Sequence, residues 1–145
     1  MKIREIKTFS EEEYKAVLNL LPRLGAHVKL PSEEDFRKIL ESETSHLFLL
    51  EAESGEIAGM LSIGKYFVPT GMKVWIEDVV VDEKYAGKGY GRQLMVYALD
   101  YAEKFGAANV ELTSRPARVA ANKLYQKLGF ELQQTNKYRF AIKKD

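Results

Sequence analysis

The sequence predicts an α/β fold of the α+β kind, with a mixed central sheet of six to seven strands flanked by about four helices. Segments with period-two alternation and segments with helical spacing follow one another over 145 residues, a length typical of one domain. The run 75–81 is largely apolar, as a central strand covered on both faces would be. A glycine-rich turn leads from this strand into a helical pattern. We therefore expect a single domain over residues 1–145.

The N-terminal half of the chain predicts one strand, two helices and then two further strands. Residues 2–7 alternate between apolar and polar side chains, which indicates a short strand. Ser10 and Ser32 are each followed by three acidic residues, as is typical of a helix N-cap with a negatively charged first turn. After these two helices, the segments 46–52 and 57–67 have the composition of strands and are joined by a short turn that contains glycine.

The C-terminal half predicts a central strand, a long helix and a shorter helix between strands. The long helix carries an apolar stripe at helical spacing, formed by Tyr90, Leu94, Tyr97, Tyr101 and Phe105. In order, the expected elements are the central strand 73–82, the helix 89–105, a fifth strand 109–114, the helix 119–128 and an antiparallel hairpin of 130–134 with 137–143.

Composition excludes several classes of function. The chain has 22 basic and 21 acidic residues, so it lacks the basic excess of a nucleic-acid-binding protein. No apolar run approaches the roughly 20 residues that span a bilayer, and the N-terminus lacks the apolar core of a signal peptide. We therefore expect a cytoplasmic protein with no membrane or nucleic-acid partner. Cysteine is absent and only His27 and His46 supply imidazole, so we expect neither a thiol nucleophile nor a metal site.

The glycine-rich turn predicts a site for a phosphate-bearing ligand. Gly87, Gly89 and Gly91 alternate directly before the long helix, whose first backbone N–H groups have no partner inside the helix. Glycine lets an anion approach such donors closely, because it has no side chain. Lys88 and Arg92 add positive charge at the same place.

Two common phosphate-binding motifs do not fit this turn. A Walker loop requires Gly-x-x-x-x-Gly-Lys-Ser/Thr, which the chain lacks. A dinucleotide fingerprint requires glycine where Arg92 stands, although Glu111 lies about 20 residues beyond, as the ribose-binding acid should. Too little chain follows Glu111 for the further βαβ units of that fold.

Two segments together resemble the GNAT superfamily of acetyl-CoA-dependent N-acetyltransferases. One is Gly89-Tyr90-Gly91 after a valine-rich strand, and the other is the stretch 122–130, which ends in Gly-Phe. The resemblance implies that the first segment binds the pyrophosphate of acetyl-CoA, and that Tyr125 in the second faces the CoA sulfur. The chain departs from the family pattern at Ala86, where arginine or glutamine is usual, and at Arg118, where many members carry asparagine.

Candidate catalytic residues lie on the central strand. Two adjacent carboxylates, Glu77 and Asp78, are costly in a buried strand unless they are paired or used. Strict alternation predicts that they point to opposite faces and that Glu77 shares its face with Val79 and Val81. The resemblance implies a base on this strand, and we assign that role to Glu77, with Asp78 or an ordered water as the alternatives. A backbone N–H near Val79–Val81 would polarise the thioester carbonyl.

We therefore expect an enzyme that moves an acetyl group from acetyl-CoA directly to a primary amine of a small molecule or a protein, without a metal. The acceptor is expected between the connection of the first two helices and the C-terminal hairpin. One alternative is a non-catalytic acyl-CoA-binding sensor or assembly module, and another is a nucleotide-binding protein. The sequence leaves open whether the chain forms a homodimer. The predicted site residues are Glu77 and Tyr125 for catalysis, and Val79, Val81, Gly87, Lys88, Gly89, Gly91, Arg92 and Asn122 for acetyl-CoA.

Overall fold

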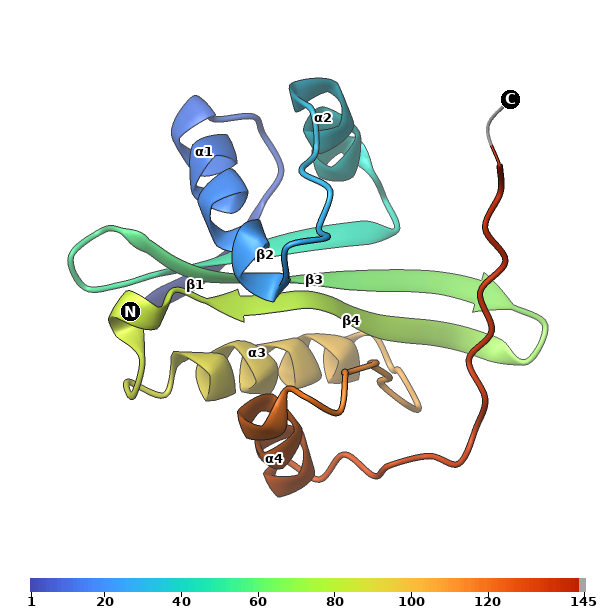
Figure 1. Cartoon of the computed structure of the whole chain (residues 1–145). Helices are drawn as coiled ribbons and strands as arrows, with labels where there is room; N and C mark the ends of the chain where they lie inside the picture. The colour runs from blue at the N-terminus through green and yellow to red at the C-terminus, as the bar shows by residue number, and fades with distance from the viewer. Residues whose placement is uncertain (144–145) are drawn as a thin grey trace. The chain divides into compact units, whose positions relative to one another are not determined.

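The structure, a computed structural model, describes residues 1–143, and its backbone divides after Thr113 into two compact units. The second unit contains one helix, α4 (Val119–Lys127). The first unit holds all the other elements (Figure 1). In chain order these are β1 (Lys2–Ile6), α1 (Glu11–Leu20), the 3₁₀ turn η1 (Leu21–Leu24), α2 (Glu33–Glu41), β2 (Ser45–Glu51), β3 (Ile57–Val68), β4 (Gly71–Val81), the 3₁₀ turn η2 (Glu83–Tyr85) and α3 (Tyr90–Lys104).

The first unit is an antiparallel sheet between two layers of helix. Its strands lie in the order β1-β2-β3-β4, each hydrogen-bonded to the next. Figure 1 shows α1 and α2 on one face and α3 on the other. No helix of residues 1–143 is long and apolar enough to cross a membrane.

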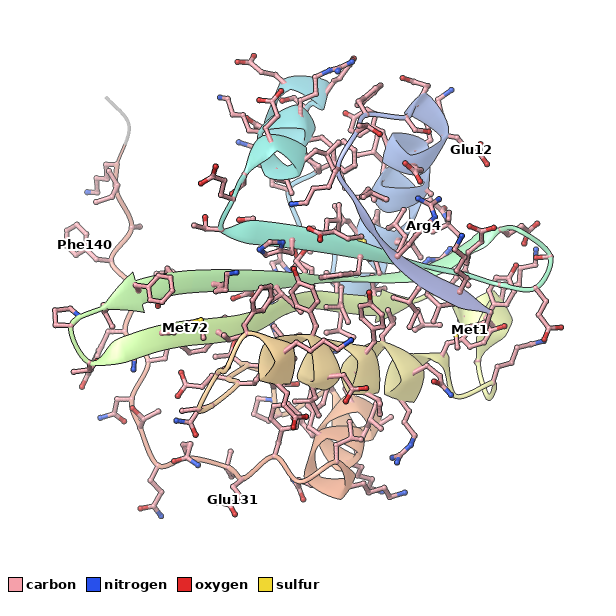
Figure 2. All side chains as sticks on the ribbon, turned by 180° about the vertical axis from the view of Figure 1, so that it is seen from behind. Met1, Arg4, Glu12, Met72, Glu131 and Phe140 are labelled. Atoms are coloured by element: carbon pink, nitrogen blue, oxygen red, sulfur yellow. The ribbon has the colours of Figure 1, made fainter. Side chains whose placement is uncertain are left out.

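Both helices of the first layer begin where the N-cap signals predict. The Ser10 hydroxyl accepts a hydrogen bond from the backbone N–H of Glu13 at 3.3 Å, and the Ser32 hydroxyl accepts one from Asp35 at 3.1 Å. Figure 2 shows Arg4 of β1 on the side of the sheet that carries α1. Arg4 forms an ion pair with Glu13, which joins the strand to that helix. Beneath the helices lies an apolar cluster of Ile6, Val17, Leu20, Leu21, Phe36, Leu40, Leu47, Leu49, Met60 and Val80.

The helix α3 covers the opposite face through aromatic packing. Phe48 on β2 is fully buried, and its ring lies edge-on to Tyr97 at 5.2 Å and to Tyr101 at 4.9 Å between centroids. Leu94 and Met95 are completely buried in the same layer. The predicted long helix is therefore confirmed, with its apolar stripe against the sheet.

The expected fifth strand is wrong. In the residues that the structure describes, the segment 109–114 pairs with β4 only through one parallel bridge between Glu111 and Trp75. The Glu111 carbonyl accepts from the N–H of Ile76 at 2.9 Å, and the Glu111 N–H donates to the carbonyl of Val74 at 3.0 Å. Asn109, at the start of this short segment, is a poor strand former, in agreement with pairing that is confined to the middle of the segment.

The expected C-terminal hairpin is also wrong, so the sheet has four strands rather than six to seven. Residues 130–143 form no strand, and the side chains of Leu132, Tyr138, Phe140 and Ile142 are more than four-fifths exposed. Alternation alone does not form a ribbon, because a two-stranded hairpin without a covered apolar face is marginally stable in water.

A buried histidine joins β1, β2 and α3 through a polar contact. His46 on β2 is 7% exposed, and its Nδ1 lies 2.7 Å from a carboxylate oxygen of Glu5 and 3.1 Å from the hydroxyl of Tyr101. The same Glu5 oxygen lies 2.8 Å from the ammonium of Lys7. Burial acts to raise the pKa of Glu5, but the bonds and charges of Lys7 and His46 outweigh it and lower the pKa below its ordinary value.

We expect Glu5→Gln to lower the free energy of unfolding at neutral pH by about 1–2 kcal/mol, because a charged hydrogen bond is lost. Since the folded-state pKa of Glu5 is depressed, its carboxylate stabilises the fold above the unfolded-state value near 4.5, and this contribution is lost as pH falls through the folded-state pKa. Urea unfolding of the variant and the parent across acidic pH measures the difference. The exposed Glu12→Gln is the control, and a Glu5 difference that stays constant with pH would contradict the assignment.

Candidate functional site

A β-bulge interrupts β4 at the two carboxylates. Ser62 on β3 pairs with Glu77 and Met60 pairs with Val80, so two residues of β4 stand opposite one residue of β3. Asp78, the first residue inside the bulge, has a φ of +52°, which is uncommon for a residue other than glycine. Bulges of this kind re-aim side chains and are frequent next to active sites.

The bulge changes which side chains share a face with Glu77. Directly paired residues of neighbouring strands project from the same face, and Ser62 and Met60 lie two residues apart on β3. Glu77 therefore lies on the face of Val80, which packs into the cluster beneath α1 and α2. This is the face on which the connection between those helices begins.

Val81 lies on the opposite face. It pairs with Gly59, where an added Cβ would meet the side chains of Val81 and of Leu94 on α3. The expectation that Glu77 shares its face with Val81 is therefore wrong. Strict alternation does not continue through a bulge, because the extra residue shifts every later side chain to the other face.

The electrostatic setting of Asp78 differs from that of an ordinary surface carboxyl. Its side chain keeps contact with solvent, yet enough protein surrounds it that desolvation raises its pKa above the ordinary value. A carboxyl with a raised pKa is one type of group that serves as a base near neutral pH. Asp78 therefore stays the alternative to Glu77.

The glycine loop forms an open helix N-terminus. Gly87 and Gly89 have φ values of +80° and +76°, in the left-handed region that favours glycine. Gly89 is the N-cap residue of α3. Because no side chain there accepts a hydrogen bond from the helix, the first backbone N–H groups of α3 stay uncovered. A Cβ added at either glycine would meet no atom within 4 Å, so the protein leaves room for an approaching ligand.

Positive side chains flank this loop. Lys88 precedes the N-cap and Arg92 lies in the first turn of α3, and both are exposed. Within residues 1–143, neither forms an ion pair. Together with the oriented N–H groups, they make the loop suitable for an anion such as a pyrophosphate.

The turn before the glycine loop is held by contacts that the motif analysis missed. Arg23 on η1 pairs with Asp82 at 3.3 Å and also with Glu83. Glu56, from the β2–β3 turn, accepts from Lys84 at 2.9 Å and from the hydroxyl of Tyr85. Arg23 and Glu56 lie far from the loop in sequence and belong to no motif, so nothing in the pattern indicated them.

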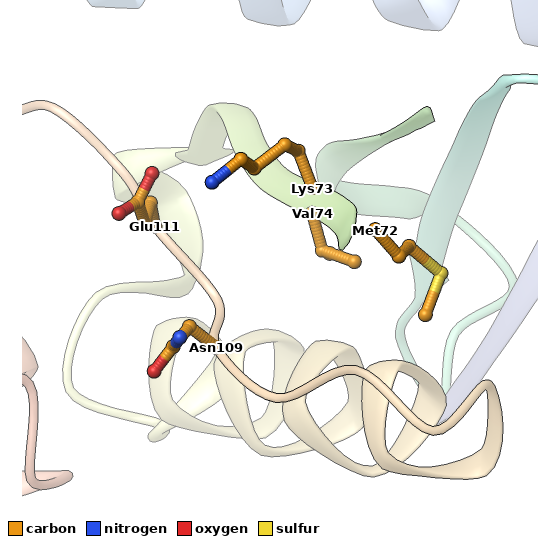
Figure 3. A pocket seen from close by; sticks show the side chains of 5 residues that line it. All are labelled: Met72, Lys73, Val74, Asn109 and Glu111. Atoms are coloured by element: carbon orange, nitrogen blue, oxygen red, sulfur yellow. The ribbon is translucent and has the colours of Figure 1, made fainter. Parts of the chain in front are cut away.

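The pocket shown in Figure 3 lies elsewhere on the first unit. It is lined by Met72, Lys73, Val74, Asn109 and Glu111, and Figure 3 shows Lys73 extending from β4 toward the side on which Glu111 lies. Its cavity volume of about 30 Å³ is far below the usual range of small-molecule sites, about 300–1,000 Å³. None of the predicted site residues lines it.

The second unit carries the other two predicted site residues on α4. The Asn122 amide donates a hydrogen bond to the carbonyl of Arg115 at 2.9 Å, which ties the helix to the segment before it. Tyr125 is 6% exposed, with its ring edge-on to Phe130 at 6.0 Å between centroids. Burial raises the pKa of the Tyr125 phenol, although the charge of Arg118 opposes the change, so the phenol keeps its proton at neutral pH.

The predicted residues thus fall into three groups. Gly87, Lys88, Gly89, Gly91 and Arg92 share one loop and helix start; Glu77, Val79 and Val81 share β4; Asn122 and Tyr125 share α4. In the part of the chain that is described, no group of three or more histidine, cysteine or acidic residues could hold a metal ion.

Comparison with known proteins connects these features to one family. The sequence profile of the acetyltransferase (GNAT) family matches residues 11–130. The N-acetyltransferase YhdJ of Bacillus subtilis (strain 168), itself uncharacterized, is 27% identical over 126 residues, which cover 86% of this chain and 89% of that protein.

Two further proteins resemble the chain over most of its length. Glucosamine 6-phosphate N-acetyltransferase of Arabidopsis thaliana is 30% identical over 119 residues, 77% of this chain and 78% of that protein. The crystal structure of an aminoglycoside acetyltransferase, meta-AAC0020, from an uncultured soil metagenomic sample superposes with a TM-score of 0.85 at 17% identity, and covers 98% of this chain and 96% of that one. At that identity the superposition shows a shared fold.

Proposed function

Because the chain belongs to the GNAT family of acetyltransferases, we propose that it transfers an acetyl group from acetyl-CoA directly to a primary amine. One observation carries the proposal: an open helix N-terminus, flanked by two cations, follows a strand whose bulge presents two carboxylates. The first feature suits the pyrophosphate of CoA, and the second suits an amine that must lose a proton.

The glycine loop binds the pyrophosphate through the first N–H groups of α3. With Ala86 in place of the family's arginine or glutamine, main-chain donors together with Lys88 and Arg92 hold the charge. The pantetheine arm bonds to the backbone of Val79 and Val81, much as an added strand would.

Proton transfer assigns roles to Glu77 and Tyr125. An amine with a pKa of about 10 is almost wholly protonated at neutral pH, so Glu77 accepts its proton, directly or through a water. The amine nitrogen then bonds to the thioester carbon, the C–S bond breaks, and the second proton that the nitrogen loses balances the one that the leaving sulfur takes up. The thiolate that leaves has a conjugate acid with a pKa of about 8.5, and the neutral phenol of Tyr125 donates a hydrogen bond to it.

The acceptor approaches from the face of α1 and α2, because Glu77 projects on that face. The name of one relative, glucosamine 6-phosphate N-acetyltransferase, specifies an amino sugar. Amino sugars are therefore the first acceptors to test, followed by polyamines and peptides with free amines.

The test is release of free thiol from acetyl-CoA with this panel of amines, beside calorimetric titration of CoA, acetyl-CoA, NAD and ATP. We expect turnover with at least one amine, and binding of the two CoA compounds alone. Acetyl-CoA binding without turnover would favour a non-catalytic acyl-CoA sensor. Equal or tighter binding of NAD would contradict the proposal.

Arg92→Ala is expected to weaken CoA binding about tenfold and Lys88→Ala about threefold, because Arg92 lies in the first turn of α3 and presents a forked set of donors. Calorimetric titration of CoA into each variant measures the two losses. Lys104→Ala, at the other end of the same helix, is the control and should bind CoA as the parent does. Equal losses, or a larger loss from Lys88→Ala, would show that Arg92 is not the main cation.

A further inference from the structure

Arg23 lies where η1 meets the turn before the glycine loop. One guanidinium nitrogen is 3.3 Å from a carboxylate oxygen of Asp82, and the other pairs with Glu83. The side chains of Arg23 and Asp82 are 24% and 16% exposed, so solvent screens this contact less than it screens the ion pairs along α1 and α2. A planar guanidinium that bridges two consecutive carboxylates fixes direction as well as distance.

The two sides of this bridge have different roles in the proposed reaction. On one side, Arg23 lies two residues before the segment 25–31, which leads from η1 to α2 on the face that Glu77 shares. On the other side, Asp82 and Glu83 open η2, and the glycine loop follows directly. The bridge therefore joins the acceptor side of the sheet to the phosphate site.

The turn η2 is also held from a second direction. Glu56 accepts from the ammonium of Lys84 at 2.9 Å and from the hydroxyl of Tyr85. Glu56 belongs to the β2–β3 turn, and neither of these two hydrogen bonds involves the segment 25–31. The two attachments are thus separable by mutation, because each reaches η2 from a different part of the fold.

We propose that Arg23 is a positioning residue that couples the segment 25–31 to the glycine loop, so that filling the phosphate site orders the acceptor side. The inference rests on the proposed function, because CoA is the ligand of the loop. Coupling of this kind is reciprocal: an acceptor held by the segment 25–31 strengthens acetyl-CoA binding by the same factor. The physical path is short, since Arg23 lies two residues before the segment 25–31 and its side chain pairs with Asp82 and Glu83, which open η2 ahead of the glycine loop.

Amide hydrogen exchange with and without saturating CoA tests the coupling. In the parent we expect CoA to slow exchange in the segment 83–92 and, by about fivefold or more, in the segment 25–31. Arg23→Met should keep the slowing at 83–92 and lose it at 25–31. Arg23→Lys should restore part of it, because lysine can reach one carboxylate. Glu56→Gln is the matched control and should keep the slowing at 25–31.

The outcomes separate the inference from the proposed function. Three results would each overturn the role of Arg23. They are slowing at 25–31 that persists in Arg23→Met, slowing there that is absent from the parent, and slowing there that is lost equally in Glu56→Gln. No slowing at 83–92 and no calorimetric binding of CoA would overturn the proposed function, and the inference with it. If Arg23→Met does not fold, Glu83→Gln is used in its place, because this variant keeps the contact between Arg23 and Asp82. A partial loss of slowing at 25–31 is then the result that supports the role of Arg23.

Discussion

Glu77→Gln is expected to slow acetyl transfer by about 10²–10⁴-fold while the dissociation constant for acetyl-CoA stays that of the parent. Glutamine keeps the size of the side chain but cannot accept a proton from the amine. The proposed pyrophosphate contacts, at the glycine loop, are untouched by the change. The loss should therefore appear in kcat and not in cofactor affinity.

The pH dependence of kcat distinguishes the base from its neighbours. Glu77→Gln should lose the ascending limb of the profile, which reports ionisation of the base. Tyr125→Phe should lower kcat but keep that limb, because it removes the proposed donor to the leaving thiolate. The combined loss should be less than additive if both groups act in one transition state.

Asp78→Asn is the decisive comparison for this assignment. Asp78 neighbours Glu77 in the bulge and has a raised pKa, so it is the strongest rival. If Glu77→Gln leaves kcat unchanged and Asp78→Asn abolishes turnover, the base is Asp78. An unchanged kcat in both variants would leave an ordered water as the base.

Gly89→Val is expected to weaken CoA binding by about 100-fold or more and to leave the chain folded. At φ +76°, a β-branched side chain costs about 1–2 kcal/mol of backbone strain, but the added Cβ meets no protein atom within 4 Å. The methyl groups instead occupy the open space through which, in the proposed site, the phosphates reach the N–H groups of α3. Binding should therefore fall much further than stability.

Gly106→Val provides a matched control at the other end of the same helix. Gly106 has a φ of +77° and equally open surroundings, so the substitution brings the same backbone strain away from the proposed site. Thermal unfolding and calorimetric titration of both variants separate strain from obstruction. Equal CoA affinity in the two variants would show that Gly89 does not border the phosphates.

Local signals predicted the helices correctly, and with them the place of the glycine loop directly before α3. The caps at Ser10 and Ser32 depend on side chains three residues from their donors, so a short window of sequence contains the whole interaction. The left-handed backbone at Gly87 and Gly89 follows in the same way from residue type. The first four strands also lie where alternation placed them.

Non-local pairing accounts for the errors. The bulge at Asp78 depends on the register between β3 and β4, which alternation within one strand does not contain. The segments 109–114 and 130–143 have strand-like composition, but a strand also needs a partner along its length. The bridge from Arg23 to Asp82 and Glu83 joins η1, which precedes strands β2 to β4 in the chain, to η2, which follows them. A motif covers only neighbouring residues, so no motif could indicate this contact.

The exposed C-terminal segment has a consequence for how the protein behaves at high concentration. Tyr138, Phe140 and Ile142 are exposed and alternate along the sequence, a pattern typical of segments that stack into intermolecular cross-β structure. Lys137 and Arg139 interleave with them and act as gatekeepers, since like charges on neighbouring copies repel. Concentrated salt screens that repulsion, so low ionic strength is the condition that keeps copies of this chain apart.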